Sequence, residues 1–225
     1  MRAWYFDNKP GHQKLPHMGE HVPNEMVYQL GIKHWKIPLE GHKKVIDEIA
    51  KERDYPNRDV INISKEGLGD IYDEKMVYFF QEHMHEDEEI RYILDGTGYY
   101  DIRETPSDNW IRFQIEAEDL IIIPVGIYHR FTLDEGDYIK SIRLFRADPK
   151  WVYLYRSKEM DVNPYRLEYV NETKEKFGIA VTEEDRVAVK EAFERHKQTE
   201  LASKKAAPIG WGQWVWSWLT WRSYT

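Results

Sequence analysis

Residues 79–96 read FFQEHMHEDEEIRYILDG, and this stretch decides the expected fold and site. It places His83 and His85 two residues apart, so in an extended strand both imidazoles project to the same side. Glu89 and Arg91 have the same parity and share that face if the strand is unbroken. Two imidazoles and one carboxylate on one face predict a site for a cation.

A further candidate ligand, His129, lies in the later segment IIIPVGIYHRFT (121–132). Pro124 and Gly126 predict a tight turn that brings the following strand back beside the first. Three histidines and Glu89 would give a site with nitrogen and oxygen ligands, which suits Fe(II), Ni(II), Mn(II) or Zn(II). In octahedral geometry such a site leaves two positions open for substrate or O2. The histidines outside this pattern are expected to be ordinary surface or core residues: His12, His17, His21, His34, His42 and His196.

Composition excludes several classes of protein. The chain has 225 residues, of which 41% are hydrophobic, so it is not globally disordered and suits one domain or one domain with a tail. The net charge is −8 and no basic patch occurs, which argues against a nucleic-acid partner. The absence of cysteine excludes disulfide scaffolds, zinc fingers and thiol nucleophiles. Because the longest apolar run (120–128) is too short to span a membrane and no secretory signal is evident, we expect a soluble intracellular protein.

The pattern divides the chain into three regions. Residues 1–81 are expected to be helical, because 41–54 and 72–83 repeat apolar residues with a helical period. Residues 83–146 contain β-branched and aromatic runs between turns, which predicts an antiparallel sandwich or barrel. The six expected strands are 88–96, 97–104, 110–119, 120–126, 128–136 and 138–145, with a turn at 95–98 between the first two.

The last region, from residue 147, has a weaker signal. Thr182 followed by three acidic residues predicts the N-terminus of an amphipathic helix over 183–197. We expect a helical extension over 156–201, then a linker (202–210) and a Trp-rich tail, so that 202–225 has no assigned role. The tail is interpreted as a loosely packed or disordered extension. An exposed strand edge, an interfacial anchor and an altered reading of the gene's end are the alternatives.

The same residues carry a family resemblance. HMHEDEEIRYILDG fits the first motif of the cupin superfamily, which is HxH, three residues, Glu, six residues and Gly, and PVGIYH (124–129) fits the core of the second. More narrowly, 82–103, 121–135 and IRLF (142–145) resemble acireductone dioxygenase. RAWYFDNKPG (2–11), LGIKHWKI (30–37) and SKEGLGDIYDEK (64–75) resemble its eukaryotic, fungal-type members. The resemblance covers residues 1–155.

The resemblance implies a mainly β fold, a cupin double-stranded β-barrel of the jelly-roll type. It implies a domain over 1–155 with N-terminal helices (1–81) packed outside a barrel core (83–146), followed by the C-terminal helical extension. It further implies a reaction of methionine salvage on acireductone, 1,2-dihydroxy-3-oxo-5-methylthiopent-1-ene. With Fe(II), the family uses O2 to make 4-methylthio-2-oxobutanoate and formate. With Ni(II), members make methylthiopropionate, formate and CO.

Residue roles follow from the residues and from the resemblance. One Fe(II) or Ni(II) per chain would be held by His83, His85, Glu89 and His129. Arg91 is expected to act as a catalytic residue that pairs with developing negative charge, and Phe131 to wall the methylthio end. By resemblance, the other substrate-binding candidates are Glu82, Arg143 and Trp151; an ordinary ion pair would explain Arg143 equally well, and closure of the barrel would explain Trp151.

Two departures from the family pattern concern backbone and pocket. The second cupin motif has glycine where Glu118 stands, so a turn that requires positive φ would be strained there. The segment WVYLYRSKEM (151–160) also differs from the family, which leaves pocket closure on that side open.

Other classes remain as alternatives. A different metal-dependent cupin enzyme, such as an isomerase, would keep the four ligands without consuming O2. A non-enzymatic regulatory or partner-binding role would not need them. Acireductone and O2 are the expected partners of a monomer located in the cytoplasm and nucleus.

Overall fold

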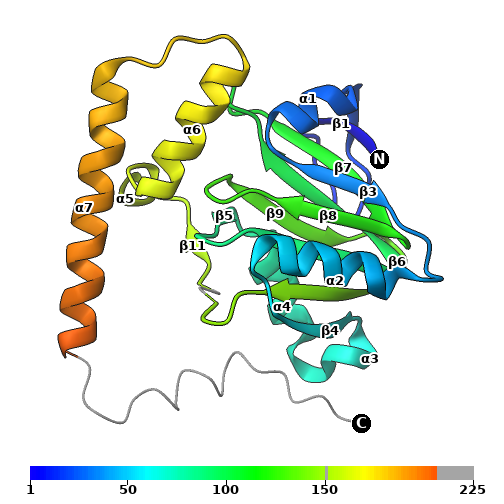
Figure 1. Ribbon diagram of the computed structural model, residues 1–225. Coiled ribbons are helices and arrows are strands. Elements are labelled where there is room, and N and C mark those ends of the chain that lie inside the picture. The colour runs from blue at the N-terminus through cyan, green and yellow to red at the C-terminus, as the bar shows by residue number, and fades with distance from the viewer. Residues whose placement is uncertain (150–151, 207–225) are drawn as a thin grey trace.

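The computed structural model describes residues 1–149 and 152–206. Within them, the strands form one antiparallel sheet in two halves that share a long strand, and helices flank the sheet (Figure 1). The strands are β1 (Arg2–Phe6), β2 (Met18–His21), β3 (Lys33–Lys36), β4 (Asn57–Ile63), β5 (His83–Met84), β6 (Glu89–Arg103), β7 (Trp110–Glu116), β8 (Asp119–Ile123), β9 (His129–Leu133), β10 (Ile139–Phe145) and β11 (Leu154–Tyr155). The helices are α1 (Asn24–Gln29), α2 (His42–Arg53), α3 (Lys65–Leu68), the short 3-10 helix η1 (Gly69–Ile71), α4 (Tyr72–Phe80), α5 (Lys158–Asp161), α6 (Pro164–Lys176) and α7 (Glu183–Ala206). The mainly β fold with a C-terminal helical extension is confirmed.

The long strand β6 takes part in both halves of the sheet. Its first half pairs with β8 and β10, and its second half pairs with β7 and β9. Between the halves Gly96 has φ +77°, and a Cβ atom there would lie 2.2 Å from the carbonyl oxygen of Tyr138. Only glycine fits this position. A bulge lies nearby at Leu94, because Lys140 pairs with Asp95 and Ser141 with Ile93. The turn expected at 95–98 is therefore wrong. The first two expected strands are one strand, which passes from one half of the sheet to the other.

The apolar run in β8 reflects burial on both sides. Ile121 and Ile123 belong to the core inside the barrel, whereas Leu120 and Ile122 belong to a second core that α2 covers through Ile46. Burying each such side chain contributes about 1.5–3 kcal/mol. Two covered faces explain why this strand reads as a continuous hydrophobic segment rather than an alternating one.

The N-terminal region (1–81) was expected to be helical, but it contains strands as well as helices. The predicted helices at 41–54 and 72–83 are present as α2 and α4, but β1, β2, β3 and β4 lie in the same region. Three of these strands pair with the barrel: β1 with β7, β3 with β8 and β4 with β10. Barrel strands without these partners would expose unpaired backbone groups along their edges. The pairing joins segments that are distant in sequence, so local periodicity cannot predict it.

The C-terminal region contains α5, α6 and α7. Thr182 and Asp185 cap α7 reciprocally, as the sequence predicted: Thr182 Oγ1 accepts from the Asp185 N–H at 3.1 Å, and Asp185 Oδ2 accepts from the Thr182 N–H at 3.0 Å. The helix continues to Ala206, so the linker predicted from 202 is wrong for its first residues. The Trp-rich tail lies outside the described residues.

Two smaller expectations are settled by the backbone. Glu118 has φ +75°, so the turn between β7 and β8 does use the left-handed conformation that the family meets with glycine. Among the described residues, no helix is both long enough and apolar enough to cross a membrane.

Candidate metal centre

The four predicted ligands converge from three strands and a loop. His83 in β5 and His129 in β9 are paired directly opposite each other in the sheet. β5 ends at Met84, so His85 lies in the loop that precedes β6, and Glu89 is the first residue of β6. The condition of an unbroken strand is therefore not met, because residues 85–88 form a loop, and this loop rather than strand parity brings His85 to the site.

The ligand atoms lie close together. One side-chain nitrogen from each of His83, His85 and His129 lies within 4.8 Å of the other two. Glu89 Oε2 is 3.4 Å from His85 Nε2 and 3.6 Å from His129 Nε2. Three imidazoles and one carboxylate are the donor set that divalent transition metals accept.

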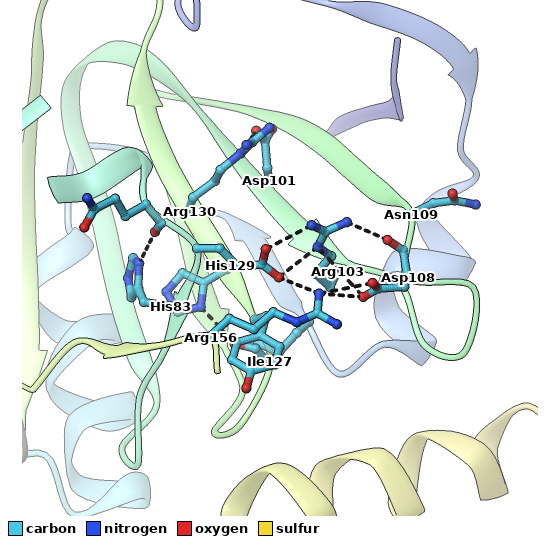
Figure 2. Close-up of polar contacts among 12 residues, drawn as sticks. His83, Asp101, Arg103, Asp108, Asn109, Ile127, His129, Arg130 and Arg156 are labelled. Carbon is cyan, nitrogen blue, oxygen red and sulfur yellow. Dashed lines mark hydrogen bonds and ion pairs between the residues drawn. The ribbon is translucent and has the colours of Figure 1, made fainter. Parts of the chain in front are cut away.

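Backbone carbonyls orient all three imidazoles. Because a carbonyl oxygen only accepts, each Nδ1 carries the proton and each Nε2 presents its lone pair. His129 Nε2 is buried and has no hydrogen-bond partner within the described residues, which would be costly unless a metal bound there. These observations fit a resident metal ion. The Nδ1 bonds run from His83 to Gln81 (2.7 Å), from His85 to Val152 (3.1 Å) and from His129 to Ile127 (3.0 Å), and Figure 2 shows His83 and His129.

The charges of the site favour ligation at neutral pH. Burial alone would raise the pKa of Glu89, but the charge of Arg91 holds that pKa well below its usual range. Burial lowers the pKa of His83 well below its usual value, and the neighbouring His129 and His85 lower it further. The carboxylate is thus ionised and the imidazole neutral, which are the forms that bind metal.

Tyr100 is a member of the site that the sequence did not reveal. Its hydroxyl donates to Glu89 Oε1, and Arg91 Nη2 lies 3.4 Å from the same oxygen. Burial and the charge of Glu89 raise the pKa of Tyr100 well above its usual value, so the hydroxyl stays protonated. These contacts hold Oε1 and leave Oε2 facing the imidazoles. The bulge at Leu94, between the pairs Lys140–Asp95 and Ser141–Ile93, reverses the parity of β6, so simple alternation from residue 83 assigns Tyr100 to the wrong face.

His83, Glu89 and His129 line a cavity with both charged and apolar walls. Its charged part includes Arg91 and Arg143, and the ring of Tyr153 lies 4.4 Å from that of His83. Tyr153 is a second residue that the sequence did not single out. The apolar wall consists of Ile61, Ile63, Phe79, Ile93, Ile115, Phe131 and Ile139.

The other predicted substrate-binding residues divide into three groups. Arg91, Phe131 and Arg143 line the cavity, and Arg143 is also held by Asp59 through an Nε–Oδ1 bond of 2.8 Å. Glu82 is not among the residues that line it, because Arg103 and Arg156 hold its carboxylate at 2.9 Å each. Figure 2 shows these two arginines beside Asp108, which also pairs with Arg156. Trp151 lies outside the described residues.

The chain is similar to proteins of one known family. The model of the ARD/ARD' family matches residues 2–153. Acireductone dioxygenase 2 of Coprinopsis cinerea is 75% identical over 98% of each chain. Acireductone dioxygenase 1 of the same organism is 57% identical over 76% of this chain and 97% of its own length.

A solved structure supports the fold. Acireductone dioxygenase from Bacillus anthracis, with a cadmium ion in its active centre, superposes with a TM-score of 0.57 at 23% identity and covers 68% of this chain and 97% of its own. The family match, the high identity and the cupin arrangement of the ligands agree. The chain belongs to the acireductone dioxygenase (ARD/ARD') family.

Proposed function

We propose that this chain is a metal-dependent dioxygenase that cleaves acireductone with O2. One observation carries the proposal: three imidazoles and an ionised carboxylate converge at a cavity that also presents two arginines and an apolar wall. Membership of the family and the names of the Coprinopsis cinerea relatives support the same reaction.

The metal would be one Fe(II) or Ni(II) ion, held by His83, His85, Glu89 and His129. When bound, it supplies a Lewis acid and a template for the oxygens of the substrate. We expect 4-methylthio-2-oxobutanoate and formate with Fe(II), and methylthiopropionate, formate and CO with Ni(II). Because its pKa is held low, Glu89 serves as a ligand and not as a proton donor.

Arg91 and Arg143 give the cavity its positive charge. Acireductone ionises to an anionic enediolate, and guanidinium groups stabilise such an anion by charge-assisted hydrogen bonds. Each arginine already faces one carboxylate: Arg91 lies beside Glu89, and Arg143 is bonded to Asp59. These carboxylates fix the guanidinium groups in place before substrate arrives, so little ordering is required on binding.

The apolar wall suits the methylthio end of the substrate. The Phe131 ring packs against Tyr100 at 5.1 Å and Phe79 at 6.2 Å, which holds all three rings in position. An apolar lining favours a thioether over water. The substrate would therefore be oriented with its oxygens at the histidines and its methylthio group at Phe131.

The test is oxygen consumption by metal-loaded enzyme supplied with acireductone. We expect Fe(II)-loaded wild type to consume O2 faster than the unaided oxidation of the substrate, and His83→Ala to lose both this activity and the bound metal. His21→Ala, in the exposed strand β2, is the matched histidine control and should keep both. Bound metal without O2 consumption would overturn the proposal and favour a different cupin reaction, such as an isomerisation.

A monomeric state and a cytoplasmic and nuclear location are further parts of the proposal. Light scattering of the purified chain and imaging of a tagged copy test them.

A further inference from the structure

The region beyond the family match lies against the segments that carry the histidine ligands. We call residues 82–86, which contain His83 and His85, and residues 126–129, which end in His129, the ligand segments. Figure 1 shows α6 (yellow) and α7 (orange) side by side along one side of the sheet, near the end where β5 and β9 lie. Several polar contacts, which range from exposed to buried, connect this region to the ligand segments.

Asn163 connects α6 to the first ligand segment. It is only 7% exposed, and its Oδ1 accepts from the Tyr165 N–H at 3.0 Å, which caps the helix. Its Nδ2 donates to Glu86 Oε1 at 3.1 Å. Both ends of one amide are thus used, and Glu86 directly follows the ligand His85. On α7, His196 Nε2 lies 3.4 Å from Glu86 Oε2, so both helices contact the same residue.

Arg166 connects α6 to the second ligand segment. Its side chain is 8% exposed, its Nη1 donates to the Gly126 carbonyl at 3.1 Å, and its guanidinium lies 4.5 Å from the Tyr128 ring centroid. Gly126 has φ +78°, and a Cβ atom there would lie 2.3 Å from the Tyr165 carbonyl oxygen. Only glycine allows α6 to approach this closely.

The two ligand segments are also joined to each other and to the start of the extension. The Gly126 N–H donates to the His85 carbonyl at 3.1 Å. Arg156 donates to Glu82 at 2.9 Å, and Asp161 accepts from the Tyr128 hydroxyl at 2.9 Å. The Arg156 guanidinium also lies 5.1 Å from the ring centroid of Tyr128, which directly precedes His129. One neighbour of each ligand histidine (Glu82, Glu86 and Tyr128) is therefore held by a residue of the C-terminal region.

We propose that residues 156–206 form a brace that fixes the ligand segments for metal binding, with Asn163 and Arg166 as positioning residues. Neither touches a ligand atom; each acts through the backbone that places the imidazoles. A ligand set that is held in place before binding loses less conformational freedom, so its metal affinity is higher. The inference rests on the proposed function to the extent that these histidines are the metal ligands. The relative that is 75% identical aligns over 98% of both chains and so includes this region.

The test uses the full-length chain and substitutions that preserve the helix. Asn163→Asp keeps the capping oxygen but removes the donor to Glu86, and Arg166→Met keeps the buried stem but removes the donor to Gly126. Asn171→Asp is the matched control, because Asn171 lies on the same helix and donates to the Asp185 carbonyl of α7 at 3.3 Å, away from the ligand segments. Ni(II) affinity is measured by competition with a chelator, and stability by urea unfolding of the metal-free protein.

We expect Asn163→Asp and Arg166→Met to weaken Ni(II) binding about tenfold, the lower end of effects measured for groups that orient ligands. Asn171→Asp should leave the affinity unchanged even if it lowers the urea midpoint by the same amount. If Asn163→Asp does not fold, Asn163→Ser, which also caps, takes its place. Wild-type affinity in both test variants would overturn the brace. A wild-type chain that binds no Ni(II) would overturn the metal site itself and the brace with it.

Discussion

Removing the Tyr100 hydroxyl is the most informative perturbation of the metal centre. In Tyr100→Phe the ring keeps its contacts with Phe113 and Phe131, at 5.8 and 5.1 Å between centroids, so only the bond to Glu89 is lost. Glu89 Oε1 then retains Arg91 Nη2 at 3.4 Å as its remaining contact in the site.

The size of the effect follows from the charge of the acceptor. A hydrogen bond to a charged group contributes about 1.5–3 kcal/mol net. At 1.4 kcal/mol per factor of ten, this corresponds to a loss of about 10- to 100-fold in metal affinity, which agrees with the effects of groups that orient ligands.

The assay is a chelator competition titration with Ni(II) on the metal-free protein, accompanied by urea unfolding. Tyr99→Phe is the matched control, because its ring lies on the opposite side of β6, 6.0 Å from Trp4 and 4.9 Å from the Arg112 guanidinium. Tyr99→Phe should bind Ni(II) like wild type. Equal affinity in Tyr100→Phe and Tyr99→Phe would refute the assignment of Tyr100 as the group that orients Glu89.

Three further predictions concern charge and pH. Arg91→Gln should lower kcat/KM for acireductone by about 10²- to 10³-fold, because it removes a donor for developing negative charge; an unchanged value would exclude a catalytic role. The pKa of His83 is lower in the folded than in the unfolded protein, so its contribution to stability is complete above about pH 6.5 and is lost as pH falls below that value. The urea midpoint of the metal-free protein should therefore fall between about pH 7 and pH 5.5, and His83→Gln should flatten this dependence. Glu82→Gln should lower the urea midpoint, because it weakens the pairs with Arg103 and Arg156, but leave KM unchanged; a raised KM would place Glu82 in substrate binding after all.

The ligands could be predicted from sequence because their signal is local. His83, His85 and Glu89 lie in one short motif, and His129 lies in a second one, PVGIYH (124–129). Each motif can be read without knowing the structure of the rest of the chain. The structure places all four side chains together, although His85 reaches the site from a loop and not from a strand. The bend after Met84 was not predicted, since a single strand would satisfy the same spacing.

The residues that the sequence missed depend on long-range geometry. Tyr100 faces the cavity because the bulge at Leu94 shifts the strand by one residue, and the adjoining segment 95–98 was interpreted as a turn. The N-terminal strands β3 and β4 exist because barrel strands need partners, which helical periodicity cannot indicate. Glu82 was assigned to the cavity by resemblance, but the arginines that hold it are distant in sequence, so no local pattern reveals them.

The central claim is that this metal centre performs the dioxygenase reaction, and product analysis tests it most directly. The protein is stripped of metal, reloaded with Fe(II) or Ni(II), and given acireductone and O2 beside a control without enzyme. The account predicts 4-methylthio-2-oxobutanoate and formate with Fe(II), and methylthiopropionate, formate and CO with Ni(II), all formed faster than in the control. Bound metal with no acceleration of any of these products would contradict it.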